Sequence, residues 1–190
     1  MKGRSRPRAL APRKPSAISV VIEDPRWRED ASVLRLIRRA ARLALNSASI
    51  SKGEAAAPRR GGRGSKSPPA ALTILLTDDA RLRTLNASFR GHDKPTNVLS
   101  FPASPSDGPY LGDVALARGV VTREARIQGK SLSAHAAHLA IHGILHLKGH
   151  DHEKPNDAQV MEALETVMLA KFGIANPYAP RHYTRRGKAA

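Results

Sequence analysis

The histidines of this chain are concentrated in one short segment, since six of the eight lie between His135 and His152. His142 and His146 are four residues apart, and on a helix this spacing places both side chains on one face, one turn apart. Gly149 then ends the helix, so the chain can turn back and offer His152 as a third ligand. Three imidazoles leave a tetrahedral zinc ion with an open position for water, whose pKa falls to roughly 7. The spacing therefore predicts a catalytic centre with one Zn²⁺ per chain.

The same spacing, H-x-x-x-H-x-x-G-x-x-H, holds the metal of the metzincin proteases. Those enzymes carry a glutamate directly after the first histidine as general base, and this chain has Gly143 at that position. A peptidase without its base loses a large part of its rate. The comparison therefore supports a metal site but disfavours peptide hydrolysis.

Four further residues surround these three histidines in the sequence. His135 and His138 continue the helical stripe one and two turns earlier, and because they recede along the axis we expect packing roles or hydrogen bonds to the ligands for them. Asp151 could orient an imidazole, and His150 could compete as a ligand. Spacing alone leaves the roles of His150 and Asp151 open.

The net charge of +16 is unevenly distributed. Segments 1–15, 51–68 and 181–190 carry six, five and four basic residues against a single acid, which is +14 of the total. Their content of Gly, Pro, Ala and Ser predicts two flexible tails and one flexible insertion. Such segments attract a polyanion such as RNA through counterion release, although solubility or genomic bias explains the same composition equally well.

Composition also excludes several classes of protein. The chain has no cysteine, so it has no disulfide framework, no thiolate zinc site and no cysteine nucleophile. No apolar stretch approaches the roughly 18 residues of a membrane span, and prolines interrupt the position of a signal-peptide core. We therefore expect a soluble, cytoplasmic protein with no membrane contact.

Hydrophobic periodicity predicts an α+β fold: a small mixed four-stranded sheet packed with about five helices in a single domain. The expected strands are 17–23, 71–77, 96–101 and 111–117, with a hairpin between the last two. The expected helices are 30–47, 80–89, 118–128, 131–147 and 157–172, with Asp78 and Asp79 capping the second. The domain should span 16–178, with the insertion 51–68 inside it and tails at 1–15 and 179–190.

Two long motifs resemble those of a known family. The segment from His142 to His152, HGILHLKGHDH, is similar to the signature H-G-x-L-H-L-x-G-Y-D-H of the YbeY family, bacterial endoribonucleases of 16S ribosomal RNA maturation and ribosome quality control. Residues 86–102, NASFRGHDKPTNVLSFP, resemble that family's N-x-x-F-R-x-x-D-x-P-T-N-V-L-S-F-P segment. Shorter matches at 111–114 and 161–165 extend the resemblance to roughly residues 17–178. Tyr is usual in the family at the position of His150.

The resemblance implies that His142, His146 and His152 are zinc ligands and that Arg90 is the basic catalytic residue associated with RNA cleavage. From the residues alone, Arg90 could clamp a phosphate or stabilise a helix C-terminus. We expect a single-strand-specific, zinc-dependent endoribonuclease whose partners are ribosomal RNA and the small subunit. Two alternatives are a non-catalytic ribosome assembly or RNA-binding factor with a structural metal, and, third, a metalloprotease. No general base is evident, so attack by water or by the 2′-OH of the RNA both remain possible.

Overall fold

Four strands form one mixed sheet in the order β1-β2-β4-β3. The computed structural model describes residues 18–47 and 70–179. Its strands are β1 (Ile18–Ile22), β2 (Ala71–Thr77), β3 (Val98–Pro102) and β4 (Tyr110–Ala117). β1, β2 and β4 are parallel to one another, while β3 pairs antiparallel with β4 as the fourth strand at the edge. The predicted hairpin between the last two strands is thereby confirmed.

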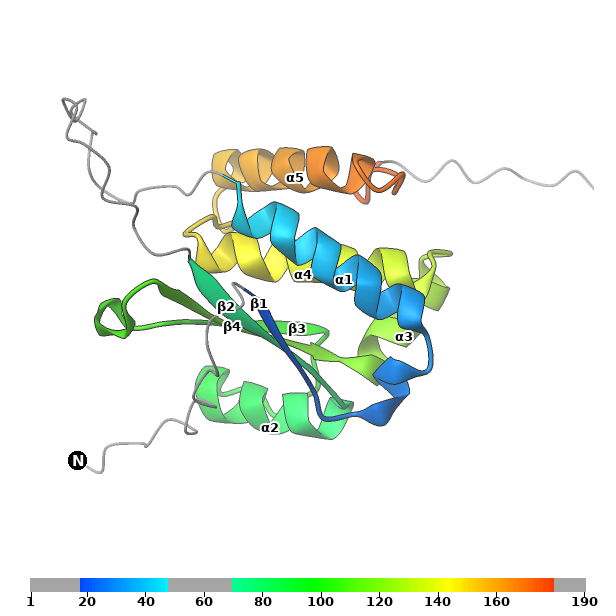
Figure 1. Ribbon diagram of the computed structural model, residues 1–190, viewed down its shortest axis with the longest axis horizontal. Coiled ribbons are helices and arrows are strands. Elements are labelled where there is room, and N and C mark those ends of the chain that lie inside the picture. Colours follow the sequence, from blue (N-terminus) through cyan, green and yellow to red (C-terminus); the bar gives the residue numbers. More distant parts are fainter. Residues whose placement is uncertain (1–17, 48–69, 180–190) are drawn as a thin grey trace, which may run out of the picture.

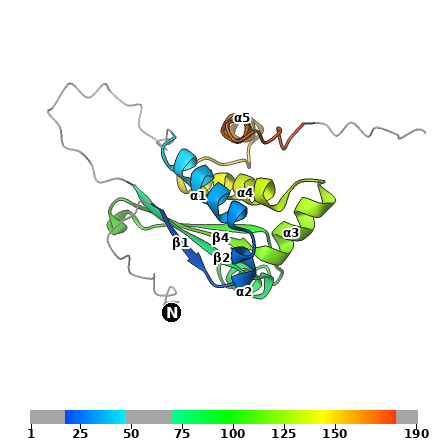
Figure 2. The ribbon, with the colours of Figure 1, turned by 45° about the vertical axis from the view of Figure 1, so that its right-hand side comes forward.

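The helices cover both faces of the sheet. They are α1 (Ala31–Leu45), α2 (Asp79–Arg90), α3 (Arg118–Ile127), α4 (Leu132–Leu147) and α5 (Pro155–Ala170). α1 and α4 pack on one face and α2 packs on the other, while α5 forms an outer layer over α1 and α4 (Figures 1 and 2). Over the residues that the structure describes, the fold is therefore of the α+β class, with a four-stranded mixed sheet and five α-helices, as the sequence predicts.

Alternation along the central strands explains the two-sided core. Leu72, Ile74 and Leu76 of β2 point toward α1 and α4, where the larger apolar cluster lies. Leu75, one residue out of phase, packs instead in the smaller cluster that includes Leu82 of α2. Because successive side chains of a strand point to opposite faces, one apolar run can serve both layers.

Side-chain caps begin three of the helices. Asp30, Asp78 and Ser131 each accept a hydrogen bond from a backbone N–H of the first turn of α1, α2 and α4, respectively. Asp79, which we predicted to cap its own helix with Asp78, has a different role. Its carboxylate accepts the backbone N–H of Val120 at 2.9 Å, in the first turn of α3. Asp79 of α2 thus caps α3, and this contact joins two distant parts of the chain.

The predicted elements agree with the structure to within a few residues at each end. Two short 3-10 helices, Pro25–Arg28 and Pro105–Asp107, were not predicted. The first carries Trp27, whose indole N–H donates to the carbonyl oxygen of Thr77 at 3.1 Å. The predicted insertion 51–68 and the tails 1–15 and 179–190 lie outside the described residues, apart from Ala179.

The C-terminal end of α4 holds the C-terminal end of α1. Lys148, the residue after α4, is 6% exposed, and its ammonium group donates to the carbonyl oxygens of Ala44 and Leu45 at 3.0 and 2.9 Å. The Ala44 carbonyl also accepts the backbone N–H of Ser47 at 3.2 Å. Both carbonyls lie at the negative end of the dipole of α1, where a buried cation is favourable. Burial lowers the pKa of Lys148. The contact fixes the relative position of the two helices that cover this face.

A missing side chain sets the distance between α4 and the sheet. Gly143 is buried, and a Cβ atom there would lie 2.6 Å from a methyl carbon of Val114 on β4. Its carbonyl oxygen accepts a hydrogen bond from the Ser100 hydroxyl of β3 at 3.0 Å. Metzincins carry their glutamate at this position, which here is packed against the sheet. A side chain at residue 143 would therefore not reach the histidines, and this disfavours the metalloprotease alternative.

We expect Gly143→Ala to lower the free energy of unfolding, measured by denaturant titration. Overpacking a core costs about 1–3 kcal/mol, whereas alanine is favoured over glycine in a helix by about 1 kcal/mol. Val114→Ala provides the control, because it removes the methyl groups that the new Cβ would meet. The double variant should lose less stability than the sum of the two single variants. Additive losses would show that Gly143 does not set this distance.

Candidate metal centre

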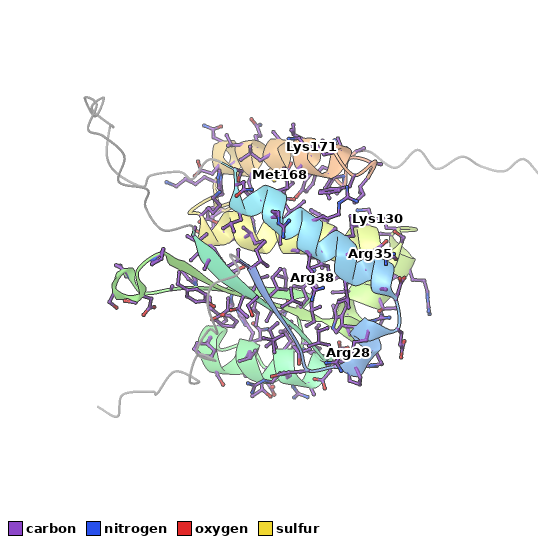
Figure 3. The ribbon with its side chains drawn as sticks, in the orientation of Figure 1. Arg28, Arg35, Arg38, Lys130, Met168 and Lys171 are labelled. Atoms are coloured by element: carbon purple, nitrogen blue, oxygen red, sulfur yellow. The ribbon has the colours of Figure 1, made fainter. Side chains whose placement is uncertain are left out.

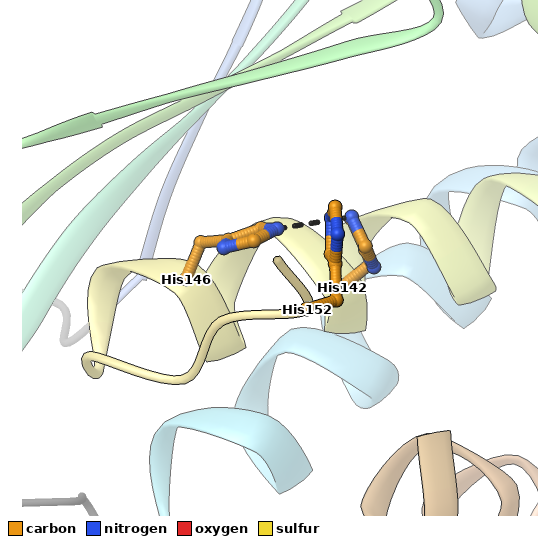
Figure 4. A group of neighbouring side chains, drawn as sticks. All are labelled: His142, His146 and His152. Carbon is orange, nitrogen blue, oxygen red and sulfur yellow. Dashed lines mark hydrogen bonds between the residues drawn. The ribbon is translucent and has the colours of Figure 1, made fainter. Parts of the chain in front are cut away.

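Three histidines from α4 and the turn after it form one group. His142, His146 and His152 each present a ring nitrogen, and these three nitrogens all lie within 4.8 Å of one another (Figure 4). The Nε2 atoms of His142 and His146 are 3.1 Å apart. A tetrahedral zinc ion with bonds of about 2.0 Å requires ligand nitrogens about 3.3 Å apart. The predicted trio is thus gathered at a spacing that can hold a metal ion.

The turn after α4 returns the chain to the helix it has just left. Gly149 has φ +89°, a conformation that glycine adopts at little cost. The backbone N–H of His150 then donates to the carbonyl oxygen of Leu145 at 3.1 Å. These features close the turn and bring His152 beside His142, with ring centres 5.2 Å apart in a stacked arrangement.

Hydrogen bonds fix which nitrogen of two of these rings faces the group. Nδ1 of His146 donates to the carbonyl oxygen of His150 at 3.1 Å, and Nδ1 of His142 lies 2.8 Å from Oε1 of Glu165. A ring that donates from Nδ1 keeps its lone pair on Nε2. When both rings are neutral, each therefore presents a lone pair at Nε2, and a cation between the two nitrogens would satisfy both.

Glu165 of α5 connects the group to a second layer of polar side chains. This carboxylate is fully buried, and its other oxygen, Oε2, lies 2.6 Å from Nε2 of His138. The Tyr178 hydroxyl also donates to Oε2. A buried carboxylate is costly unless it is paired and hydrogen-bonded, and here three side chains share it.

The electrostatics keep the ring of His146 neutral. Burial, together with the neighbouring His142 and His152, lowers the pKa of His146 to about 4. Burial alone would raise the pKa of Glu165, but the hydrogen bonds with His138 and His142 outweigh it and hold that pKa at about 2. Burial and the nearby carboxylate raise the pKa of Tyr178. The group thus combines a neutral imidazole with an ionised carboxylate behind it, the protonation states that metal binding requires.

The remaining histidines of the segment and Asp151, all within the described range 70–179, are not members of the group, although most of them contact the three histidines or their partners. His138 contacts Glu165, and His135 contacts Glu124 with its Nε2 2.7 Å from the carboxylate. Asp151 accepts a hydrogen bond from the backbone N–H of His152 at 2.8 Å and so shapes the turn. His150 is 5% exposed, and neither of its ring nitrogens has a hydrogen-bond partner in the described part of the chain. His150 is therefore not a member of the three-histidine group.

Arg90 is not part of the three-histidine group. It is the last residue of α2, on the opposite face of the sheet from α4, and its side chain is exposed. Over the described ranges, no hydrogen bond or ion pair joins it to the histidines. The neighbouring Phe89 packs edge-to-face on Phe101 of β3, with ring centres 5.1 Å apart. The end of α2 is therefore anchored to the edge strand that also contacts α4 through Ser100.

Glu165 is the residue that sequence reasoning missed. It lies within the segment 161–165 that resembles the family, but no role was predicted for it. A signal was present, because Glu165 stands among Met161, Met168 and Leu169 on the buried stripe of α5. A carboxylate on the apolar stripe of a helix needs a partner in the core, and the histidines of α4 are the cationic or donor groups nearby.

No helix in the two described ranges is long and apolar enough to cross a membrane.

We expect His150→Phe to stabilise the protein, measured as a higher midpoint of thermal unfolding. The substitution replaces a buried ring with two unpaired nitrogens by an apolar ring, and an unpaired buried polar group costs about 1–3 kcal/mol. His92→Phe, at an exposed histidine, serves as the control and should change stability little. A lower midpoint for His150→Phe would mean that the imidazole has a partner in solution.

Comparison with known proteins places these features in a family. A family model described as "Endoribonuclease YbeY" matches residues 54–173. Three curated relatives carry the same name. That of Rhodopseudomonas palustris is 53% identical over 117 residues, 58% of this chain and 70% of its own. That of Nitrobacter hamburgensis is 43% identical over 173 residues, 87% of this chain and 83% of its own. That of Laribacter hongkongensis is 50% identical over 122 residues, 62% of this chain and 74% of its own.

Among solved structures, a solution structure of a Thermotoga maritima protein aligns with a TM-score of 0.48 and 20% identity, over 89% of this chain and 99% of the other. The assignment rests on the sequence relatives and on the family model, whose matched residues include all three histidines of the group. The chain therefore belongs to the YbeY family of endoribonucleases, which are hydrolases.

Proposed function

We propose that this protein is a zinc-dependent endoribonuclease that cleaves single-stranded RNA, with ribosomal RNA of the small subunit as its substrate in 16S 3′-end maturation and late ribosome quality control. His142, His146 and His152 hold one zinc ion per chain, and Arg90 binds the phosphate at the scissile position. The observation that carries the proposal is the convergence of the Nε2 atoms of His142 and His146, 3.1 Å apart, beside His152.

The donor set fits zinc. Neutral imidazoles suit this ion, and three protein ligands are the number found in catalytic zinc sites, which keep one position open. Bound zinc would supply a Lewis acid that activates water or stabilises the charge that develops on a phosphate. The chain's own contribution is orientation: Glu165 and the carbonyl group of His150 hold the two Nδ1 atoms, so that the rings cannot turn away.

Arg90 is suited to hold a phosphate because its guanidinium group is uncommitted. No carboxylate pairs with it in the described part of the chain, and a guanidinium group can bind phosphate through two parallel hydrogen bonds. The edge strand β3 lies between the end of α2 and α4, since Phe101 contacts Phe89 and Ser100 contacts Gly143. RNA that crosses this edge would meet Arg90 on one side and the histidines on the other.

Glu165 is not the general base in this proposal. It is fully buried, and three hydrogen-bond partners occupy its oxygens. A base must come within hydrogen-bond reach of the proton it takes. The nucleophile is thus either water or the 2′-OH of the RNA, and cleavage of an RNA with a 2′-deoxy scissile nucleotide distinguishes them, because only the first route survives the substitution.

We expect the wild type to cleave a labelled single-stranded RNA and His146→Ala to lose that cleavage, because one of three ligands is removed. Both proteins are purified identically, so that a contaminating nuclease appears in both lanes. As a control, chelator-treated wild type should regain cleavage on addition of zinc, whereas His146→Ala should not. Arg90→Gln should lose cleavage while its zinc content stays at the wild-type level.

Equal cleavage by wild type and His146→Ala, or none by either, would contradict the proposal. If His146→Ala then lost zinc and thermal stability while RNA binding persisted, the metal would be structural, and the protein would be a ribosome assembly or RNA-binding factor.

We expect Glu165→Gln to weaken zinc binding by about 10–100-fold, the usual effect of removing a carboxylate that orients a ligating histidine. Glutamine keeps the shape of the side chain but removes its charge. Competition with a chromophoric chelator measures the affinity without any assay of activity. Glu162→Gln, on the same helix, is the matched control and should leave the affinity unchanged. Equal affinities for both variants would show that Glu165 only packs.

A further inference from the structure

The outer face of α1 carries an uncompensated row of arginines. Arg38 and Arg39 lie three and four residues after Arg35, and Arg42 lies four and three residues after them. All four are therefore neighbours on one side of the helix, and all four are exposed. α1 contains no acidic residue. Like charges three or four residues apart destabilise a helix by about 0.2–0.5 kcal/mol per pair. The row therefore costs stability unless an anion binds to it.

Four arginines outside α1 lie close to carboxylates. Arg26, Arg83 and Arg123 pair with Asp24, Asp93 and Asp79 at 2.7, 2.7 and 2.9 Å. Arg81 lies 3.8 Å from Glu23. For the arginines of α1, in contrast, no carboxylate comes within salt-bridge distance anywhere in 18–47 or 70–179. The structure thus neutralises several of its surface arginines and leaves this row available.

Three of the four arginines of the row, Arg38, Arg39 and Arg42, form one wall of a groove, which we call the arginine groove. It has a volume of about 460 Å³ and lies between α1 and the end of α5, on the side shown in Figure 3. Its lining includes Arg38, Arg39, Arg42, Asn46, Lys171 and Phe172. The Arg39 guanidinium carbon lies 5.3 Å from the centre of the Phe172 ring, which holds that side chain against the wall. Four cations and an amide line this open groove, and no acidic residue does.

We propose that the arginine groove binds the phosphates of single-stranded RNA at nucleotides away from the cleaved bond. The inference rests on the proposed function, since that function supplies the polyanion. Guanidinium groups match phosphate in charge and in hydrogen-bond geometry, and a groove of unpaired cations releases counterions from a nucleic acid backbone. The lining is cationic, opposite in charge to an RNA backbone, and it contains no carboxylate that would repel the phosphates.

The groove is separate from the metal centre but connected to it by α5. None of the three histidines lines it. Lys171 lies six residues after Glu165, which is about 9 Å further along the chain direction of that helix and on a different side of it. An RNA bound in the groove therefore occupies a surface that the cleaved nucleotide does not. The groove should add affinity and leave the cleavage step itself unchanged.

The test compares two double variants with the same loss of charge. Arg38→Gln/Arg42→Gln removes two groove cations and leaves Arg39 on Phe172. The matched control, Arg81→Gln/Arg83→Gln, removes two exposed arginines that already face carboxylates. Binding of a labelled single-stranded RNA is measured by fluorescence anisotropy over a series of salt concentrations, and the integrity of the RNA is checked on a gel.

For the groove variant we expect the slope of log Kobs against log[salt] to decrease in magnitude by about 1.4, which corresponds to two phosphates on a single strand. The control should keep the wild-type slope. Arg38→Lys/Arg42→Lys, which retains the charge, should keep most of it. In cleavage, the groove variant should show a higher KM and an unchanged kcat.

Equal slopes for wild type and the groove variant would overturn the inference, as would equal losses in the groove variant and the control, because net charge alone would then explain the effect. Neither result touches the proposed function, which depends on the comparison of wild type with His146→Ala. An absence of RNA binding by the wild type would overturn both.

Discussion

The close approach of α4 to the sheet is the constraint on which the site depends. Gly143 faces Val114 at a distance that admits no side chain. With residue 143 directed at the sheet, helix geometry turns His142 and His146 to the same side, about 40° apart around the axis. Their rings then meet α5 and the turn that carries His152, instead of the core. A glycine that makes no contact through a side chain thus determines where three imidazoles gather.

The second requirement is the assembly of α5 on α4, because the centre includes a carboxylate that only α5 supplies. Glu165 is fully buried and would be costly without its partners, while the Nδ1 atom of His142 would be free to turn without Glu165. Glu165 of α5 therefore needs the histidines of α4 as partners, and His142 needs Glu165 to fix its ring. Folding of the outer layer and orientation of the candidate ligands are a single event, so changes that loosen α5 should act on metal binding even at a distance from the histidines.

Much of this could be read from the sequence because it depends on local patterns. The apolar spacing of α1 and the β-branched run of β1 predict these elements, and the spacing of His142, His146 and His152 predicts their convergence, because helix geometry and one glycine turn determine it. Contacts between distant segments could not be read in this way. The cap of α3 by Asp79, the partnership of Glu165 with His138, and the lack of partners around His150 all depend on how layers pack. Periodicity identifies a buried face but not the residue opposite it.

The distribution of charge suggests how binding and chemistry are divided on this surface. Electrostatic attraction of an RNA backbone is additive over many phosphates and does not depend on sequence, so it can be supplied by cations far from the reacting bond. Chemistry at one phosphate requires groups fixed within fractions of an ångström. The four arginines of α1 are exposed and share one face without acids, whereas the rings of His142 and His146 are held at Nδ1 by hydrogen-bond partners. On the proposed function, salt concentration should therefore govern how long an RNA stays bound, and the metal should govern whether it is cut.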